Sequence, residues 1–102
     1  MDDAPRPDDC QTMIDVRRGV DATDRALVAL LETRFAYMRA AARIKPEKGQ
    51  VRDEARKAQV IENARVLAEA AGLPAEAIAD LWERLVETSI TYEGAHWDSL
   101  KG

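Results

Sequence analysis

Seven charged or polar side chains occupy positions that the sequence pattern assigns to helix-packing faces. They are Arg17, Arg34, Lys45, Asp53, Arg56, Ser89 and Glu93. A charge that is buried without a partner is costly, so each of these groups needs a partner, and for the cations this could be a protein carboxylate or a carboxylate on a ligand. Guanidinium and ammonium groups bind carboxylates well, and arginine binds them in a bidentate fashion. The set therefore predicts a site for a small organic dianion, held between cationic side chains.

Each of these positions also has an ordinary explanation. A single arginine at the edge of a helix seam commonly extends its head group to water while its stem covers apolar neighbours. The functional hypothesis depends on the whole set, because all three predicted helices contribute to it. Other candidates are weaker: His96 and Cys10 have no ligand constellation, and Trp82 and Trp97 stand at helical spacing and are interpreted as packing residues.

The spacing of apolar residues predicts the helices that must position these side chains. Helical periodicity runs from about 12 to 44, from about 51 to 71, and from 75 to at least 93. None of the five glycines and four prolines lies between positions 21 and 45, so the first helix is unusually long. Pro46 ends it, and Gly72 and Pro74 separate the other two. We predict an all-α fold, with a flexible lead at 1–11 and a helical domain at 12–102.

The length of the first helix predicts a second chain. Arg17 and Arg34 are 17 residues apart, or about 25 Å along one helix, so they cannot grip the same small molecule. An antiparallel second copy would bring its own Arg17 close to Arg34 and Lys45 of this chain. The sequence therefore predicts a homodimer with shared sites, in which the long helices pack along each other.

The composition limits the classes of partner. The formal net charge is -4, which argues against non-specific nucleic-acid binding and against an anionic membrane surface. One cysteine and one histidine cannot form an intramolecular disulfide or a Cys/His metal cluster. No apolar run approaches the ~18 residues of a membrane span, and the acidic N-terminal segment does not fit a signal peptide. We predict a cytoplasmic protein that binds a small dicarboxylate and uses no metal or cofactor.

The order and spacing of these motifs resemble those of the all-helical class of chorismate mutases and of the related isochorismate pyruvate lyases. The resemblance extends from about Asp9 to Trp97. The residues that carry it are Asp15-Val16-Arg17, Asp21-x-x-Asp24, Leu30-Leu31-x-x-Arg34, Ala40-Ala41-Ala42-Arg43-Ile44-Lys45, Val51-Arg52-Asp53-x-x-Arg56, and the pair Ser89 and Glu93.

The resemblance implies an intertwined helical homodimer with two active sites. It assigns the two substrate carboxylates to Arg34 and to an Arg17 contributed by the other chain, with Arg56 assisting. Lys45 would face the ether oxygen of the enolpyruvyl group. The rearrangement of chorismate to prephenate is intramolecular and needs no nucleophile, so catalysis would come from orientation and from stabilising charge on that oxygen.

The remaining assignments bear on the choice of substrate. The resemblance implies that Asp53 lies near the ring hydroxyl and that Ser89 and Glu93 close the pocket. Many mutases carry Gln in place of Glu93, and a glutamate donates a hydrogen bond only when protonated, so we expect a rate that rises below neutral pH. Lys57 replaces a Glu that binds the ring hydroxyl in some mutases, which leaves the choice between chorismate and isochorismate open.

Three hypotheses follow from the sequence. The first is a chorismate mutase, which the sequence favours. The second is an isochorismate pyruvate lyase, which would release salicylate and pyruvate from the same fold. The third is a helical dimerisation or regulatory module without catalytic activity, whose seam charges would pair with each other, for example Asp24 with Arg34 across the dimer.

Overall fold

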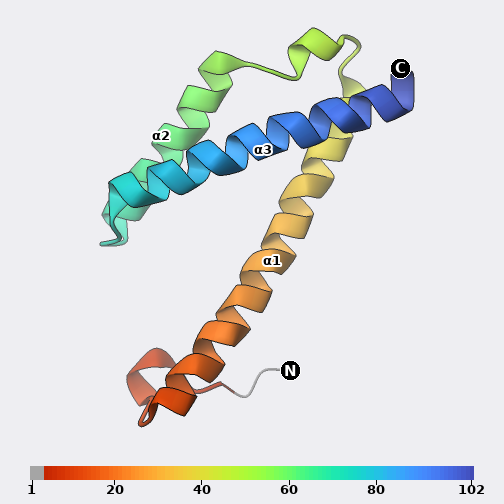
Figure 1. Ribbon diagram of the computed structural model, residues 1–102. Coiled ribbons are helices and arrows are strands. Elements are labelled where there is room, and N and C mark those ends of the chain that lie inside the picture. The colour runs from red at the N-terminus through yellow and green to blue at the C-terminus, as the bar shows by residue number, and fades with distance from the viewer. Residues whose placement is uncertain (1–3) are drawn as a thin grey trace. The chain divides into compact units, whose positions relative to one another are not determined.

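The computed structural model describes residues 4–102, and within this range every regular element is helical (Figure 1). The elements in chain order are η1 (Pro7–Asp9), α1 (Met13–Ile44), η2 (Lys48–Gln50), α2 (Glu54–Ala70) and α3 (Ala75–Lys101). The prediction of an all-α chain with a long first helix is confirmed. The chain divides into two compact units, residues 1–36 and 37–102, which are described in turn.

Local hydrogen bonds fix the start of α1 in the first unit. The backbone N–H of Asp15 donates to Thr12 Oγ1 over 3.2 Å, and the backbone N–H of Gln11 donates to Asp15 Oδ2 over 3.0 Å. The first bond satisfies an N–H group that the first turn of a helix leaves unpaired, and the second joins the residue before the helix to the same turn. The preceding lead contains the 3₁₀ turn η1, and residues 1–3 of that predicted lead lie outside the described residues.

The second unit is built around a helical hairpin of α2 and α3, which lie side by side (Figure 1). α2 begins at Glu54, three residues later than the spacing predicts, because the side chain of Asp53 caps it: the backbone N–H of Arg56 donates to Asp53 Oδ1 over 3.0 Å. Gly72, with φ 75°, adopts the left-handed conformation that ends α2. α3 begins after Pro74 and continues beyond Gly94 to Lys101.

Small side chains make up the buried core of the described residues. The buried apolar residues are Ala42, Val51, Ala64, Ala68, Ala79 and Val86, and no large side chain among them is fully enclosed. Helical spacing predicts that Leu67 and Ala71 share the buried face of α2 with Ala64, but this is wrong: Leu67 is 71% exposed and Ala71 is exposed, whereas Ala68 is 3% exposed. Alanines allow two helix backbones to approach closely, so the hairpin packs through Ala64 and Ala68.

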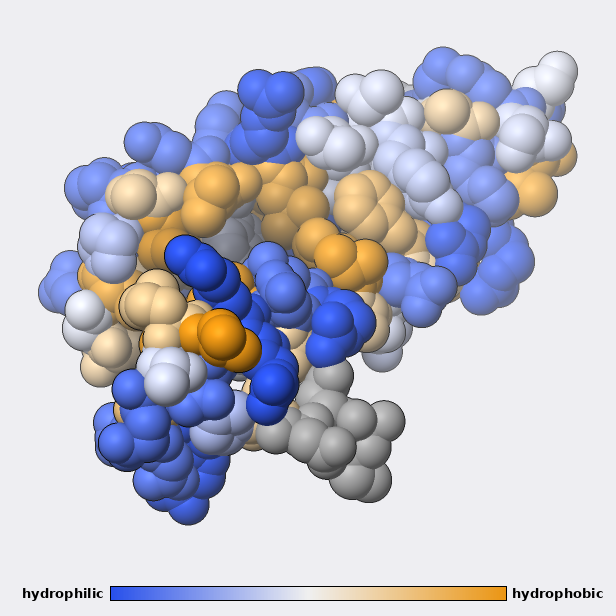
Figure 2. All heavy atoms as spheres, turned by 60° about the horizontal axis from the view of Figure 1, so that its bottom comes forward, coloured by the Kyte–Doolittle hydropathy of each residue, from blue (hydrophilic) through white to orange (hydrophobic). Residues whose placement is uncertain are grey.

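The first unit leaves most of its apolar side chains exposed. More than half of the surface of Met13, Ile14, Val20, Leu27, Val28 and Leu30 is accessible, and Ala42, which lies in the second unit, is the only buried residue of α1. The space-filling view likewise shows orange apolar patches between the blue polar residues (Figure 2). No helix within residues 4–102 has the length and apolar character needed to cross a membrane.

Candidate functional site

Lys45 and Glu93 form an ion pair at the junction of α1 and α3. Lys45 Nζ lies 2.6 Å from Glu93 Oε2, although the two residues are 48 positions apart in the sequence. The Glu93 side chain is 5% exposed and the Lys45 side chain is 29% exposed. A carboxylate this deeply buried requires a cation within hydrogen-bond distance, and Lys45 provides it. The structure thus brings together two of the seven predicted site residues from separate helices.

Ser89 lies one helical turn before Glu93 on the same face of α3. It is buried, and its Oγ donates to the carbonyl oxygen of Leu85 over 2.7 Å. This bond to the preceding turn is a common arrangement for a serine inside a helix. Ser89 and Glu93 are the two buried polar residues of the described chain, and they form one polar strip along α3.

Asp53 and Arg56 are exposed residues at the start of α2. The carboxylate of Asp53 is used as the helix cap, and the guanidinium of Arg56 donates to Gln59 Oε1 over 2.6 Å. An open hollow of about 690 Å³ has Lys45 and Asp53 in its lining, together with Arg52. Lys45 and Asp53 therefore face a common space, which is large enough to accept a small organic molecule.

Lys57 belongs to a group of charges that joins α2 to α3. Its Nζ lies 2.9 Å from Glu83 Oε1 and 2.7 Å from Glu87 Oε2, while Arg52 binds both oxygens of Glu87 over 2.8 and 3.0 Å. Hydrogen bonds from Arg52 and then from Lys57 lower the pKa of Glu87 to about 2. Hydrogen bonds to Glu87 and then to Glu83 raise the pKa of Lys57.

Arg17 and Arg34 both belong to the first unit and lie on α1. Arg17 is exposed and Arg34 is partly buried. Because a helix rises 1.5 Å per residue, their backbones are separated by about 25 Å along α1. Within this chain the two arginines are thus too far apart to bind one small molecule together.

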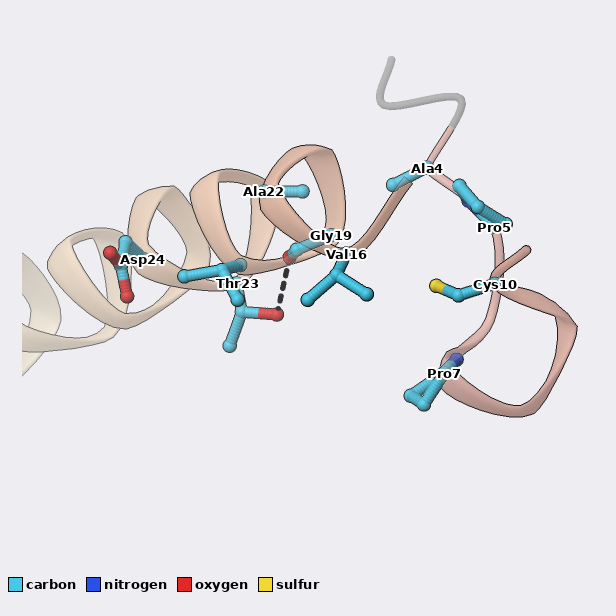
Figure 3. Close-up of a pocket in the computed structure, with 10 residues that line it drawn as sticks. Ala4, Pro5, Pro7, Cys10, Val16, Gly19, Ala22, Thr23 and Asp24 are labelled. Carbon is cyan, nitrogen blue, oxygen red and sulfur yellow. Dashed lines mark hydrogen bonds between the residues drawn. The ribbon is translucent and has the colours of Figure 1, made fainter. Parts of the chain in front are cut away.

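A second hollow lies in the first unit, between the N-terminal lead and the first turns of α1 (Figure 3). It has a volume of about 480 Å³, and its lining includes Pro5, Pro7, Cys10, Val16 and Val20. Among the described residues of the lining, Asp24 is the one that carries a charge, and a carboxylate does not attract a dianion. The sequence analysis missed this hollow because it treated the lead as flexible.

The sequence analysis also missed contacts that the end of α3 makes with the end of α1. Trp97, interpreted as a packing residue, donates its indole N–H to the carbonyl oxygen of Lys45 over 3.0 Å. Arg39 donates to the hydroxyl of Tyr92 over 2.7 Å. No group of three His, Cys, Asp or Glu side chains that could hold a metal ion is found in residues 4–102.

Comparison with known proteins identifies the same stretch of chain. The model of one protein family, chorismate mutase type II, matches residues 16–94, a range that contains all seven predicted site residues. An isochorismate pyruvate lyase from Pseudomonas aeruginosa is 27% identical over 96 residues, which cover 94% of this chain and 95% of that protein. Similarity therefore extends over nearly the full length of both chains.

Proposed function

Given that the chain belongs to the chorismate mutase type II family, we propose that it converts chorismate to prephenate. The observation that carries this proposal is the Lys45–Glu93 pair beside a hollow that Lys45 shares with Asp53. A mutase of this kind needs a cation at the ether oxygen and a polar neighbour to orient it. Among residues 4–102, Lys45 is the lysine that is both partly buried and paired with a buried carboxylate.

The reaction needs the enzyme to hold a flexible dianion in a compact conformation. Arg34, with Arg17 of the partner subunit, binds the two carboxylates, and Arg56 assists. Lys45 donates to the ether oxygen as negative charge builds on it, and this is where preorganised donors contribute most. Glu93 and Ser89 line the pocket, and Asp53 lies nearest the ring hydroxyl. Orientation and charge stabilisation together account for the rate enhancement.

A homodimer is part of this proposal. The exposed apolar residues of α1 would be buried by packing against another apolar surface. A second long helix could provide that surface, because the apolar residues repeat at heptad-like spacing. An antiparallel arrangement would also overcome the separation of about 25 Å between Arg17 and Arg34. Each site would then use Arg17 from one protomer and Lys45 from its partner.

Mixing two inactive variants tests the shared site. In a heterodimer of Arg17→Ala and Lys45→Ala, one of the two sites would be intact, so an equal mixture should regain about a quarter of wild-type turnover. The matched control mixes Arg34→Ala with Lys45→Ala, which remove groups from the same protomer's half of the site and should regain nothing. Recovery in both mixtures or in neither would contradict the proposed sharing.

Isochorismate pyruvate lyase is the second candidate. Two observations favour it: the similarity to the Pseudomonas aeruginosa lyase, and Lys57 at a position where some mutases carry a hydroxyl-binding Glu. A lysine has no carboxylate to accept a hydrogen bond from a ring hydroxyl, and the ammonium of Lys57 is already paired with Glu83 and Glu87 of α3. Lys45 would have the same task in either reaction, because both break the enolpyruvyl ether bond.

Separate assays with chorismate and isochorismate distinguish the candidates. Prephenate from chorismate supports the mutase, whereas salicylate and pyruvate from isochorismate support the lyase. A third outcome, no turnover of either substrate and no thermal stabilisation by a millimolar chorismate-like dicarboxylate, would favour a module without catalytic activity. Binding in the absence of turnover would support the dianion site and contradict the enzyme.

A further inference from the structure

The last two turns of α3 hold the backbone of Lys45 at the end of α1. Trp97 Nε1 donates to the Lys45 carbonyl oxygen over 3.0 Å, and Lys101 Nζ donates to the same oxygen. Lys101 Nζ also lies 5.4 Å from the centre of the Trp97 ring, close enough for a cation–π contact. Figure 1 shows these blue turns of α3 against the yellow end of α1.

Pro46 leaves carbonyl groups at the end of α1 without their usual backbone donors. In a continuing helix the carbonyl of Ala42 would accept from the N–H of residue 46, but proline has none. Lys101 Nζ replaces that donor over 2.9 Å, and it reaches the carbonyl of Arg43 over 3.2 Å. The N–H of Glu47, which would otherwise serve Arg43, donates to Gln50 Oε1. Lys101 therefore acts as a cap for a helix that ended nearly sixty residues earlier in the chain.

Glu93, Trp97 and Lys101 are spaced four residues apart and so lie on one face of α3. This face of α3 binds both the side chain and the backbone of Lys45. Glu93 accepts from its ammonium group, and Trp97 and Lys101 donate to its carbonyl oxygen. We infer that Trp97 and Lys101 are positioning residues, which fix the Lys45 backbone so that its ammonium is directed into the site. The functional half of this inference rests on the proposed function, whereas the contact itself does not.

Two conservative variants test the inference. Trp97→Phe keeps an aromatic ring but removes the indole donor, and Lys101→Met keeps the side-chain length but removes the ammonium. Each should lower kcat about tenfold and leave KM nearly unchanged, since a misplaced catalytic group costs rate more than binding. Lys101→Arg retains a cationic donor and should recover most of kcat. The matched control is Asp98→Asn, which breaks the exposed Lys48–Asp98 pair on the same turn and should stay within about twofold of wild type.

Amide hydrogen exchange provides a readout that does not depend on turnover. The N–H of Lys45 donates to the Ala41 carbonyl, so its exchange reports opening of the last turn of α1. Trp97→Phe and Lys101→Met should accelerate exchange there, and Asp98→Asn should not. If wild type turns over neither substrate, the proposed function fails while exchange still tests the contact. Unchanged exchange and kcat in both variants would overturn the inference, as would a chain-wide acceleration that Asp98→Asn shares.

Discussion

At the scale of single residues, the role proposed for Lys45 would link catalysis to stability through its ion pair with Glu93. Replacing Lys45 by Met should lower kcat about 100-fold or more, equivalent to about 3 kcal/mol of barrier, because the developing charge on the ether oxygen loses its donor. The same change leaves the buried Glu93 carboxylate without its cation, so the thermal unfolding midpoint should also fall. Steady-state kinetics and a thermal melt measure the two effects.

A double variant separates these two effects of Lys45. Lys45→Met combined with Glu93→Gln removes both charges, so the unfolding midpoint should recover towards that of wild type while kcat stays low. If kcat recovered with the midpoint, Lys45 would be a structural residue and the assignment of the ether-oxygen donor would have to move elsewhere.

At the scale of elements, Asp53 has two separable roles. Asp53→Ala removes the cap of α2 and should lower the free energy of unfolding by about 1 kcal/mol. Asp53→Asn retains a capping oxygen and should be nearly as stable as wild type, but it removes the charge proposed to lie near the ring hydroxyl. Urea denaturation and KM measurements on the two variants distinguish capping from substrate recognition, and equal loss of stability in both would contradict the capping role.

The Arg52–Glu87–Lys57 group makes the α2–α3 hairpin sensitive to acid. Glu87 has a folded-state pKa of about 2, below its ordinary value of 4.5, so its stabilising effect is present above pH 4.5 and is lost as the pH falls from there towards 2. Glu87→Gln should be less stable than wild type at neutral pH and about equally stable near pH 2. Denaturant titrations at several pH values test this, with Glu69→Gln, on the exposed side of α2, as the control expected to show a smaller change.

The elements show how far local patterns predict this fold. The length of α1 and the turn at Gly72 follow from spacing, proline and glycine, which act within a few residues. The first residue of α2 is harder to predict, because the sequence alone does not distinguish an aspartate that caps a helix from one in its first turn. The burial of Ala68 in place of the predicted Leu67 depends on how closely α2 and α3 approach each other, and no local sequence pattern specifies that distance.

The candidate site, too, could be predicted only in part from local sequence patterns. Lys45, Ser89 and Glu93 could be chosen as candidates because polar residues are conspicuous on apolar stripes. Trp97 and Lys101 could not, since a tryptophan on an apolar stripe and a lysine in a last turn are both ordinary there. Their significance comes from carbonyl oxygens more than fifty positions away, which only the fold brings within reach.

At the scale of the whole molecule, the exposed apolar side chains of α1 lead to a prediction about assembly. Val20, Leu27 and Leu31 follow one another on α1 at the heptad-like spacings of seven and four. Leu27 is exposed in the single chain, so Leu27→Glu should dissociate the proposed dimer and abolish turnover. Ala29→Glu introduces the same charge on the opposite side of the helix and should leave the dimer intact. Sedimentation velocity measures the outcome, and a wild-type monomer at micromolar concentration would contradict the proposed assembly.

The bond between the Lys45 carbonyl and the end of α3 also constrains the order of events during synthesis. Lys45 is translated more than fifty residues before Trp97 and Lys101, and until these are made the end of the first helix has no distant donors for its last carbonyls. The nascent chain can complete helical turns early, but Lys45, the proposed catalytic group, acquires its final geometry only when these contacts, 52 and 56 residues apart in sequence, have formed. Catalytic competence should therefore be the last property to mature as the newly made protein emerges.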